Sequence, residues 1–293
     1  MSLISIVVPC FNEEETIPIF YEEIKKIEKE MEAEIEFYFI DDGSSDATLY
    51  ILRELRKKDL RVHYISFSRN FGKEAALLAG MEASTGDFIV TMDVDLQDPP
   101  SLLPEMWRTL CFGNNEYDCV ATRRSTRKGE PLLRSYLSKL FYKIINWMSL
   151  TEIVDGARDY RFMSRKMANA IINDKEYNRF SKGLYSWVGF KTRWIEYENI
   201  ERSAGKTKWS FSALVKYSVE GILAYSTIPL SLASIMGIFF CMVSFLVMIF
   251  IVVRAALYGD PVAGWPSMVS IITFLDGIIL LFLGIIGLYL FKI

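Results

Sequence analysis

Histidine is nearly missing from this 293-residue chain, which contains His63 and no other. That residue falls within an apolar run typical of a β-strand, so we expect it to be structural. A nucleophile activated by histidine and a metal site built from histidines are therefore excluded. Any general base in this chain must be a carboxylate.

Two glycine-rich phosphate-binding motifs are also missing. No Gly-x-Gly-x-x-Gly follows the first predicted strand, and Gly-x-x-x-x-Gly-Lys-Ser/Thr occurs nowhere in the chain. Neither a dinucleotide-binding fold nor a P-loop is therefore supported. If the protein binds phosphates, a metal ion and cationic side chains must hold them.

Cysteine pairs and a leader sequence are absent as well. The 4 cysteines, at 10, 111, 119 and 241, have neither paired nor metal-ligand spacing, as is typical of a reduced compartment. The first nine residues carry no basic flank and no long apolar core. We therefore expect no cleaved secretory signal.

Short apolar runs alternate with helical patterns over the first hundred residues. Strand-like runs lie at 4–8, 35–40, 62–67 and 88–92, and helix-period segments lie at 17–31, 47–57 and 73–84. This alternation predicts an α/β fold with a mainly parallel sheet covered by helices on both faces. Polar segments follow the strands at 9–13, 41–46, 68–73 and 93–97. Because ligands bind at the carboxyl ends of such strands, we expect these segments to form one site.

Asp93 and Asp95 follow the fourth predicted strand with a spacing of i and i+2. In an extended segment this spacing puts both carboxylates on one side, where they can bind Mg2+ or Mn2+ that neutralises a diphosphate. The alternative is an acidic turn ahead of Pro99 and Pro100.

Asp41 and Asp42 follow the second predicted strand. A carboxylate can accept two hydrogen bonds at once, which suits the polar edge of a base and a ribose hydroxyl. The alternative is that the acidic segment only caps the next helix. We expect both uses, with Ser45 or Asp46 as the capping residue.

Two long apolar segments occupy the end of the chain, at 228–253 and 268–293, and Asp276 is the one acidic interruption of the second. Each can cross a hydrocarbon core of about 30 Å as a helix. We expect a short extracytoplasmic loop at 254–267 and a juxtamembrane amphipathic helix at 210–227. Lysines before the first span and at Lys292, against Arg254 in the loop, predict a multi-pass cell (plasma) membrane protein with a cytoplasmic catalytic domain.

Basic residues concentrate in the middle of the chain, at Arg123, Arg124, Arg127, Lys128, Arg134, Lys139 and Lys143. Apolar residues between 131 and 148 recur at helical spacing, which predicts an amphipathic helix. This helix lies either at a bilayer surface or with its apolar stripe on the domain core, and both alternatives stay open. The apolar stripe argues against nucleic acid as the partner.

Four segments in order carry a family resemblance: Pro-Cys-Phe-Asn-Glu at 9–13, Asp-Asp-Gly-Ser-Ser-Asp at 41–46, Ser-Arg-Asn-Phe-Gly-Lys-Glu at 68–74 and Met-Asp-Val-Asp-Leu-Gln-Asp-Pro-Pro at 92–100. With them the chain resembles family 2 glycosyltransferases of the GT-A fold. It is similar in particular to polyprenyl-phosphate glycosyltransferases, the group of bactoprenol glucosyltransferases and dolichol-phosphate mannose synthases. The resemblance covers nearly the whole chain and implies a GT-A catalytic domain at 1–209.

The resemblance also implies roles for individual residues. It identifies Asp159 as the catalytic base, with Asp155 as the second candidate; a salt-bridged turn of Asp155, Arg158 and Arg161 is the structural alternative. It gives the loop that contains Arg202 and Lys208 a role in diphosphate binding. The residues expected to bind nucleotide are Pro9, Phe11, Glu13, Asp41, Asp42 and Asp93. Those expected to bind phosphate or acceptor are Gln97, Arg123, Arg134, Arg202 and Lys208.

The expected reaction moves one sugar from a nucleotide diphosphate donor to polyprenyl (undecaprenyl) phosphate with inversion, in a bilayer. UDP-glucose and UDP-N-acetylglucosamine are the expected donors, and UDP is chosen by resemblance alone. Two alternatives stay open: a processive polysaccharide synthase, and a non-catalytic membrane scaffold that binds nucleotide-sugars. The resemblance also allows a homo-oligomer formed through the membrane helices.

Overall fold

A computed structural model of the protein describes residues 2–113, 116–125, 143, 146, 154, 156–174, 179, 181–198, 228–259 and 264–292. The chain divides into two compact units, 1–146 with 151–224, and 147–150 with 225–293, and each is treated by itself. Several predictions concern residues outside the described ranges: Asp155, Arg134, Arg202, Lys208 and the helix at 210–227. Of the predicted helix at 131–148, only Lys143 and Asn146 are described, and both are helical and exposed.

The first unit is built on one sheet of 7 strands in the order β3-β2-β1-β4-β6-β5-β7. The strands are β1 (Ser2–Cys10), β2 (Ala33–Asp41), β3 (Val62–Ser66), β4 (Phe88–Thr91), β5 (Cys119–Arg124), β6 (Ala157–Ser164) and β7 (Thr192–Tyr197). Strand β6 is antiparallel to its neighbours β4 and β5, and every other neighbouring pair is parallel. The predicted mainly parallel α/β sheet is confirmed.

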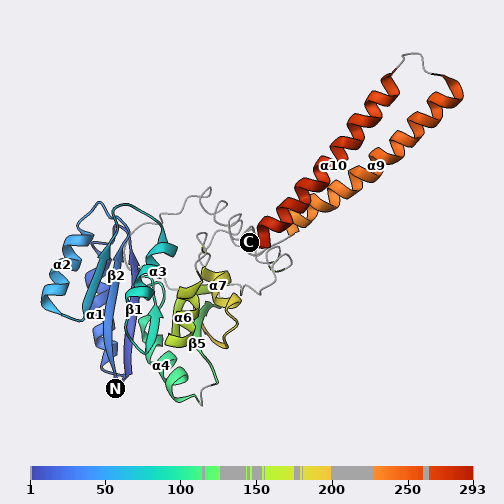
Figure 1. Ribbon diagram of the computed structural model, residues 1–293. Coiled ribbons are helices and arrows are strands. Elements are labelled where there is room, and N and C mark those ends of the chain that lie inside the picture. The colour runs from blue at the N-terminus through green and yellow to red at the C-terminus, as the bar shows by residue number, and fades with distance from the viewer. Residues whose placement is uncertain are drawn as a thin grey trace. The chain divides into compact units, whose positions relative to one another are not determined.

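Helices pack against both faces of this sheet (Figure 1). They are α1 (Thr16–Glu28), α2 (Thr48–Lys58), α3 (Lys73–Ala83), α4 (Leu103–Phe112), α6 (Arg165–Asn173) and α7 (Ser181–Trp187), with a 3-10 turn, η1 (Pro100–Leu102), before α4. Apolar side chains of α1, α2 and α4 join one buried cluster, and those of α3, α6 and α7 join the other. Alternate residues of β1 enter opposite clusters, Ile6 and Val8 one and Val7 the other, as the period of a strand requires.

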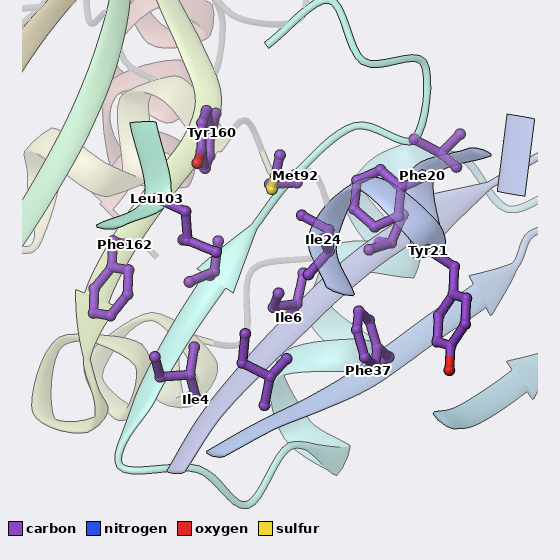
Figure 2. Packing of buried hydrophobic residues seen from close by; sticks show 14 of the residues in the cluster. Ile4, Ile6, Phe20, Tyr21, Ile24, Phe37, Met92, Leu103, Tyr160 and Phe162 are labelled. Carbon is purple, nitrogen blue, oxygen red and sulfur yellow. The ribbon is translucent and has the colours of Figure 1, made fainter. Parts of the chain in front are cut away.

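Aromatic side chains fill much of the first cluster. Figure 2 shows Phe20, Tyr21 and Ile24 of α1 over Ile6 and Phe37 of the sheet. The ring centroids of Tyr21 and Phe37 lie 5.4 Å apart. Burying each such side chain stabilises the fold by about 1.5–3 kcal/mol, so this layer holds the strand ends in fixed register.

The second unit contains two long helices, α9 (Ile228–Tyr258) and α10 (Trp265–Lys292). They pack closely, because a side chain on Gly277 would come within 2.8 Å of the Cα atom of Cys241. The stretches Ile238–Tyr258 and Ser267–Ile286 have mean hydropathies of 2.7 and 2.6, long and apolar enough to cross a membrane. Large apolar side chains along both helices are exposed.

Candidate active site

The carboxyl ends of β1, β2, β3 and β4 lie at one edge of the sheet, because these strands are parallel. Strand β6 runs the other way and therefore begins at this edge, with Thr91 of β4 opposite Arg161. Asp159 lies two residues before Arg161, just beyond the end of β4. The topology thus brings Asp159 to the segment that contains Asp93 and Asp95.

The segment after β4 leaves the strand and turns at Val94 and Asp95, although buried and half-buried residues still alternate along it. Asp93, Asp95 and Gln97 are half-buried, whereas the residues between and after them, Val94, Leu96 and Asp98, are buried. Oδ1 of Asp95 accepts a hydrogen bond from the amide of Gln97 at 3.2 Å, so the predicted alternative of an acidic turn ahead of Pro99 is present here. A shared metal site of Asp93 and Asp95 stays a prediction. The turn is tight at Leu96, whose φ of 56° is unusual for a leucine.

Lys73 joins two of the predicted site carboxylates. It is the first residue of α3, and its Nζ atom lies 2.6 Å from Oδ1 of Asp93 and 2.6 Å from Oδ2 of Asp159. The side chains of Lys73, Asp93 and Asp159 are 32%, 24% and 18% exposed. Burial by itself lowers the pKa of the Lys73 ammonium, but Asp159 and Asp93 outweigh it and raise this pKa above its ordinary value. Lys73 therefore carries its charge between these two carboxylates at neutral pH.

A buried ion pair between Asp98 and Arg158 lies next to Asp93. Asp98 is fully buried, and its Oδ1 atom accepts hydrogen bonds from Nε of Arg158, at 2.7 Å, and from the hydroxyl of Tyr197. Nη2 of Arg158 also lies 4.0 Å from Oδ2 of Asp93. Burial by itself lowers the pKa of Arg158, but Asp98 and Asp93 raise it overall, so the guanidinium stays charged.

The sequence interpretation gave Asp98 no role, although a signal was present. Buried and half-buried residues alternate along 93–98, and Asp98 is at one of the buried positions. A buried charged residue needs a partner. The predicted alternative, a turn in which Arg158 and Arg161 pair with Asp155, stays a prediction because Asp155 lies outside the described residues. Arg158 reaches Asp98, and the guanidinium of Arg161 stacks on Tyr185, 4.1 Å from the ring centroid.

Asp41 and Asp42 are buried at the end of β2. Asp41 accepts hydrogen bonds from the Ser44 amide, at 2.9 Å, and the Ser66 hydroxyl, at 2.8 Å. Asp42 accepts from the amides of Phe71 and Gly72 at 2.7 and 3.0 Å. Burial raises the pKa of Asp42, against those two amides, which lower it. Both carboxylates therefore hold the loops in place. A carboxylate can accept further hydrogen bonds, so nucleotide binding by Asp41 and Asp42 stays a prediction.

The loops after β1 and β2 are joined by hydrogen bonds that the sequence did not reveal. The amide of Asn12 donates to the Ser44 hydroxyl at 2.9 Å, and its side-chain oxygen accepts from the Ser45 amide at 2.8 Å. Asn12 has a φ of 53°, a conformation that asparagine tolerates better than most residues. Asp46 accepts from the amide of Thr48, the first residue of α2, at 3.0 Å. Asp46 thus accepts from the first amide of α2, but the N-cap position is Ala47, one residue later than expected.

The remaining predicted binding residues lie around the same edge or outside it. Pro9, Phe11 and Glu13 are half-buried at the end of β1 and after it, beside the loop that follows β2. Gln97 accepts a hydrogen bond from Nη2 of Arg124 at 3.2 Å. Arg123 forms an exposed ion pair with Glu196 of β7. Roles for these residues in binding substrates stay predictions.

The residues at this edge fit a divalent cation that is shared with a substrate. No group of three or more His, Cys, Asp or Glu side chains that could hold a metal is gathered within the described ranges. Proteins commonly bind Mg2+ with one or two carboxylates, and waters and substrate phosphates supply the other ligands. Asp93 and Asp95 are therefore enough protein ligands for such a site. In the structure the Lys73 ammonium balances the charge of Asp93 and Asp159.

Comparison with known proteins places this geometry in context. A family model described as glycosyl transferase family 2 matches residues 5–172. The bactoprenol glucosyl transferase of Shigella phage SfX is 41% identical over 290 residues, which cover 99% of this chain and 94% of that protein. The prophage bactoprenol glucosyl transferase homolog of Escherichia coli (strain K12) is 40% identical over 287 residues, covering 98% and 93%.

A solved structure supports the fold. Glucosyl-3-phosphoglycerate synthase from Mycobacterium tuberculosis, in complex with Mn2+, UDP-glucose and phosphoglyceric acid, is similar with a TM-score of 0.50. The similarity covers 76% of this chain and 78% of that chain, at 18% sequence identity. At this identity the likeness concerns the fold alone, and it confirms the predicted GT-A fold.

Proposed function

The chain belongs to glycosyl transferase family 2, and from this premise we propose that it moves a single sugar from a nucleotide diphosphate donor to polyprenyl phosphate in a membrane. The protein is a glycosyltransferase, and the proposal concerns its substrates, its metal and its residue roles. Glucose is the proposed sugar because full-length relatives are named bactoprenol glucosyl transferases. UDP is the proposed nucleotide, and UDP-N-acetylglucosamine is the second candidate donor. The proposed product serves cell-envelope glycan or glycolipid modification.

One observation carries the proposal: Asp93, in the segment after β4, and Asp159, in β6, bind the same ammonium, each at 2.6 Å. A metal-binding carboxylate and a base are thus close enough to act on one substrate pair. This is what a direct transfer from a diphosphate donor to a second substrate requires.

The proposed chemistry is a single displacement. An oxygen of the acceptor phosphate attacks the anomeric carbon, the bond from that carbon to the diphosphate oxygen breaks, and the nucleoside diphosphate leaves. Asp159 orients the acceptor phosphate and takes up its residual proton when one is present. Because there is one displacement, the configuration at the anomeric carbon inverts.

Asp93 and Asp95 would hold Mg2+ or Mn2+ on the donor diphosphate. Bound there, the cation neutralises charge that develops on the leaving group. The nucleoside would lie against the half-buried residues Pro9, Phe11 and Glu13, with Asp41 and Asp42 behind them. The Arg158–Asp98 pair keeps the Asp93 segment in position while the charge there changes.

The acceptor in this proposal is a lipid, and the second unit supplies the means to reach it. Both α9 and α10 contain a stretch that is long and apolar enough to span a bilayer. The structure gives α9 and α10 the ends of the predicted loop at 254–267, so Arg254 lies within α9. We place the catalytic unit on the cytoplasmic side because Lys206, Lys208 and Lys216 precede α9, whereas Arg254 is the one cation near the connection to α10. Reporter fusions after Ile293 and within 260–263 would test this orientation, with opposite signals expected.

The decisive experiment presents full-length protein in vesicles with polyprenyl phosphate and a panel of radiolabelled nucleotide-sugars. We expect transfer of one sugar per lipid from UDP-glucose, loss of transfer on chelation, and recovery with Mg2+ or Mn2+. D93N should lose transfer, whereas K57M, which changes an exposed lysine of α2, should keep it.

The same experiment separates the competing functions. Products with more than one added sugar would favour a processive polysaccharide synthase. Donor binding without consumption, with every donor and metal tried, would favour a non-catalytic scaffold. Retention of the donor's anomeric configuration, read by NMR of the product, would refute the single displacement.

A further inference from the structure

Lys73 belongs to the motif at 68–74, but the resemblance gives it no role. We propose that Lys73 is a resident counter-ion, which neutralises Asp93 and Asp159 before the donor arrives, gives up Asp93 to the incoming divalent cation and then positions Asp159 alone. This inference rests on the proposed function for the identity of the cation. Lys73 is a positioning residue in this account, since it acts on the reaction through Asp159.

Helix stability does not explain a lysine at this position. Lys73 begins α3, and the amino end of a helix carries partial positive charge, which disfavours a cation there. A residue that is unfavourable for its own secondary structure is expected at a functional site. For Lys73, the contacts of Nζ with two half-buried carboxylates offset the unfavourable position at the start of the helix.

The two carboxylates need a cation between them. Asp93 and Asp159 both lie 2.6 Å from the same nitrogen atom, so their own charges are close to one another. A third acid, Glu74, is near: Asp159 and burial both raise its pKa, and burial has the larger effect. Without Lys73 this group of acids would repel itself until a metal arrived.

A divalent cation on Asp93 would repel the ammonium that now lies 2.6 Å from the same carboxylate, which favours a shift of the ammonium away from Asp93. The ammonium can keep its contact with Asp159. The backbone before Lys73 is held by two amide hydrogen bonds to Asp42, so the change would be confined to the lysine side chain. Lys73 would therefore move from two carboxylates to one as the metal binds.

Removal of the ammonium should therefore strengthen metal binding when no nucleotide is present. We expect K73M to bind Mn2+ about tenfold more tightly than the wild type, measured as free Mn2+ by electron paramagnetic resonance, since the competing charge is gone. K57M is the matched control, because it removes the same charge from a lysine whose side chain is 71% exposed. Its Mn2+ affinity should equal that of the wild type.

Thermal unfolding gives a second readout that does not need activity. Without metal, K73M should unfold at a lower temperature than the wild type, and Mn2+ should raise its Tm more than that of the wild type. In transfer assays K73M should lower kcat with little change in the donor KM, and K73R should recover part of kcat. A structural role alone would not couple the Tm deficit to Mn2+.

Equal or weaker Mn2+ binding by K73M, in protein that unfolds cooperatively, would overturn the inference. So would a Tm deficit that Mn2+ leaves unchanged. If K73M did not fold, the same Mn2+ titration on K73Q would decide between the two results. Failure of sugar transfer by the wild type with every donor would refute the proposed function, while the Mn2+ comparison among variants would still decide the role of Lys73.

Discussion

Replacement of Arg158 by methionine tests the support beneath the Asp93 segment. Methionine keeps much of the volume of the arginine stem but removes the guanidinium that donates to Asp98 at 2.7 Å. Asp98 is fully buried, and its Oδ2 atom has no hydrogen-bond partner among the residues that the structure describes. R158M would leave the Tyr197 hydroxyl as the one donor to this carboxylate among the residues that the structure describes.

The expected cost follows from the burial of the pair. Removing one partner of a buried ion pair destabilises a protein by about 3–5 kcal/mol, since the other charge stays buried without compensation. For a unit of about 150–250 residues, each kcal/mol lowers the Tm by about 2–4 °C. R158M should therefore unfold roughly 6–20 °C below the wild type.

An exposed ion pair provides the control. Arg123 and Glu196 are 41% and 52% exposed, and such pairs contribute about 0–1 kcal/mol. R123M should therefore have a Tm close to that of the wild type. Both variants can be compared by circular dichroism of the detergent-solubilised protein.

A double-mutant cycle identifies the partner. D98N and R158M should each destabilise the unit, but the double variant should lose about 1–3 kcal/mol less than the sum, since no buried charge is left. The explanation is wrong if R158M loses no more stability than R123M. It is also wrong if the effects of D98N and R158M add to within about 0.5 kcal/mol.

Three further predictions concern other parts of the first unit. The hydrogen bond from Arg61 lowers the pKa of Asp59, so its stabilisation is present above the ordinary carboxyl pKa and is lost as the pH falls. D59N should cost about 1 kcal/mol at pH 7, and urea unfolding should show this difference shrinking below about pH 4; a constant difference would contradict the assignment. Gly43 has a φ of 68°, and a Cβ atom there would lie 2.4 Å from the carbonyl carbon of Arg69, so G43A should destabilise the unit by about 1–3 kcal/mol in urea unfolding, whereas an unchanged midpoint would show that the loop relaxes. D159N should lower kcat by about 100- to 10,000-fold with little change in donor binding, and near-normal turnover would remove Asp159 as the base.

Local periodicity was enough to predict the strands and helices of the first hundred residues. Short apolar runs end where β1 to β4 end within one or two residues, because a strand buried on both faces needs apolar residues along its whole length. For Asp93 and Asp95 the spacing left two alternatives, and the turn of the second is present, because Asp95 accepts from the Gln97 amide at 3.2 Å. Two apolar stretches near the end of the chain predicted helices, which the structure has as α9 and α10.

The partners of the site residues could not be read in this way. Lys73 and Asp159 are 86 positions apart in the sequence, and Asp98 and Tyr197 are 99 apart. No spacing rule connects such positions. The sequence motifs identified most of the residues at the site but not which of them touch.

The amino-acid sequence by itself determined the class of fold, the gathering of polar segments at one edge of the sheet and the two apolar helices. Each follows from side-chain period, strand direction or segment length. The tertiary structure alone decided that β6 inserts antiparallel between β4 and β5, and with it the meeting of Asp159, Lys73 and Asp93. It also decided that Arg158 pairs with Asp98. Strand order depends on the packing of distant segments against a common core, and that free energy is not contained in any local stretch of the chain.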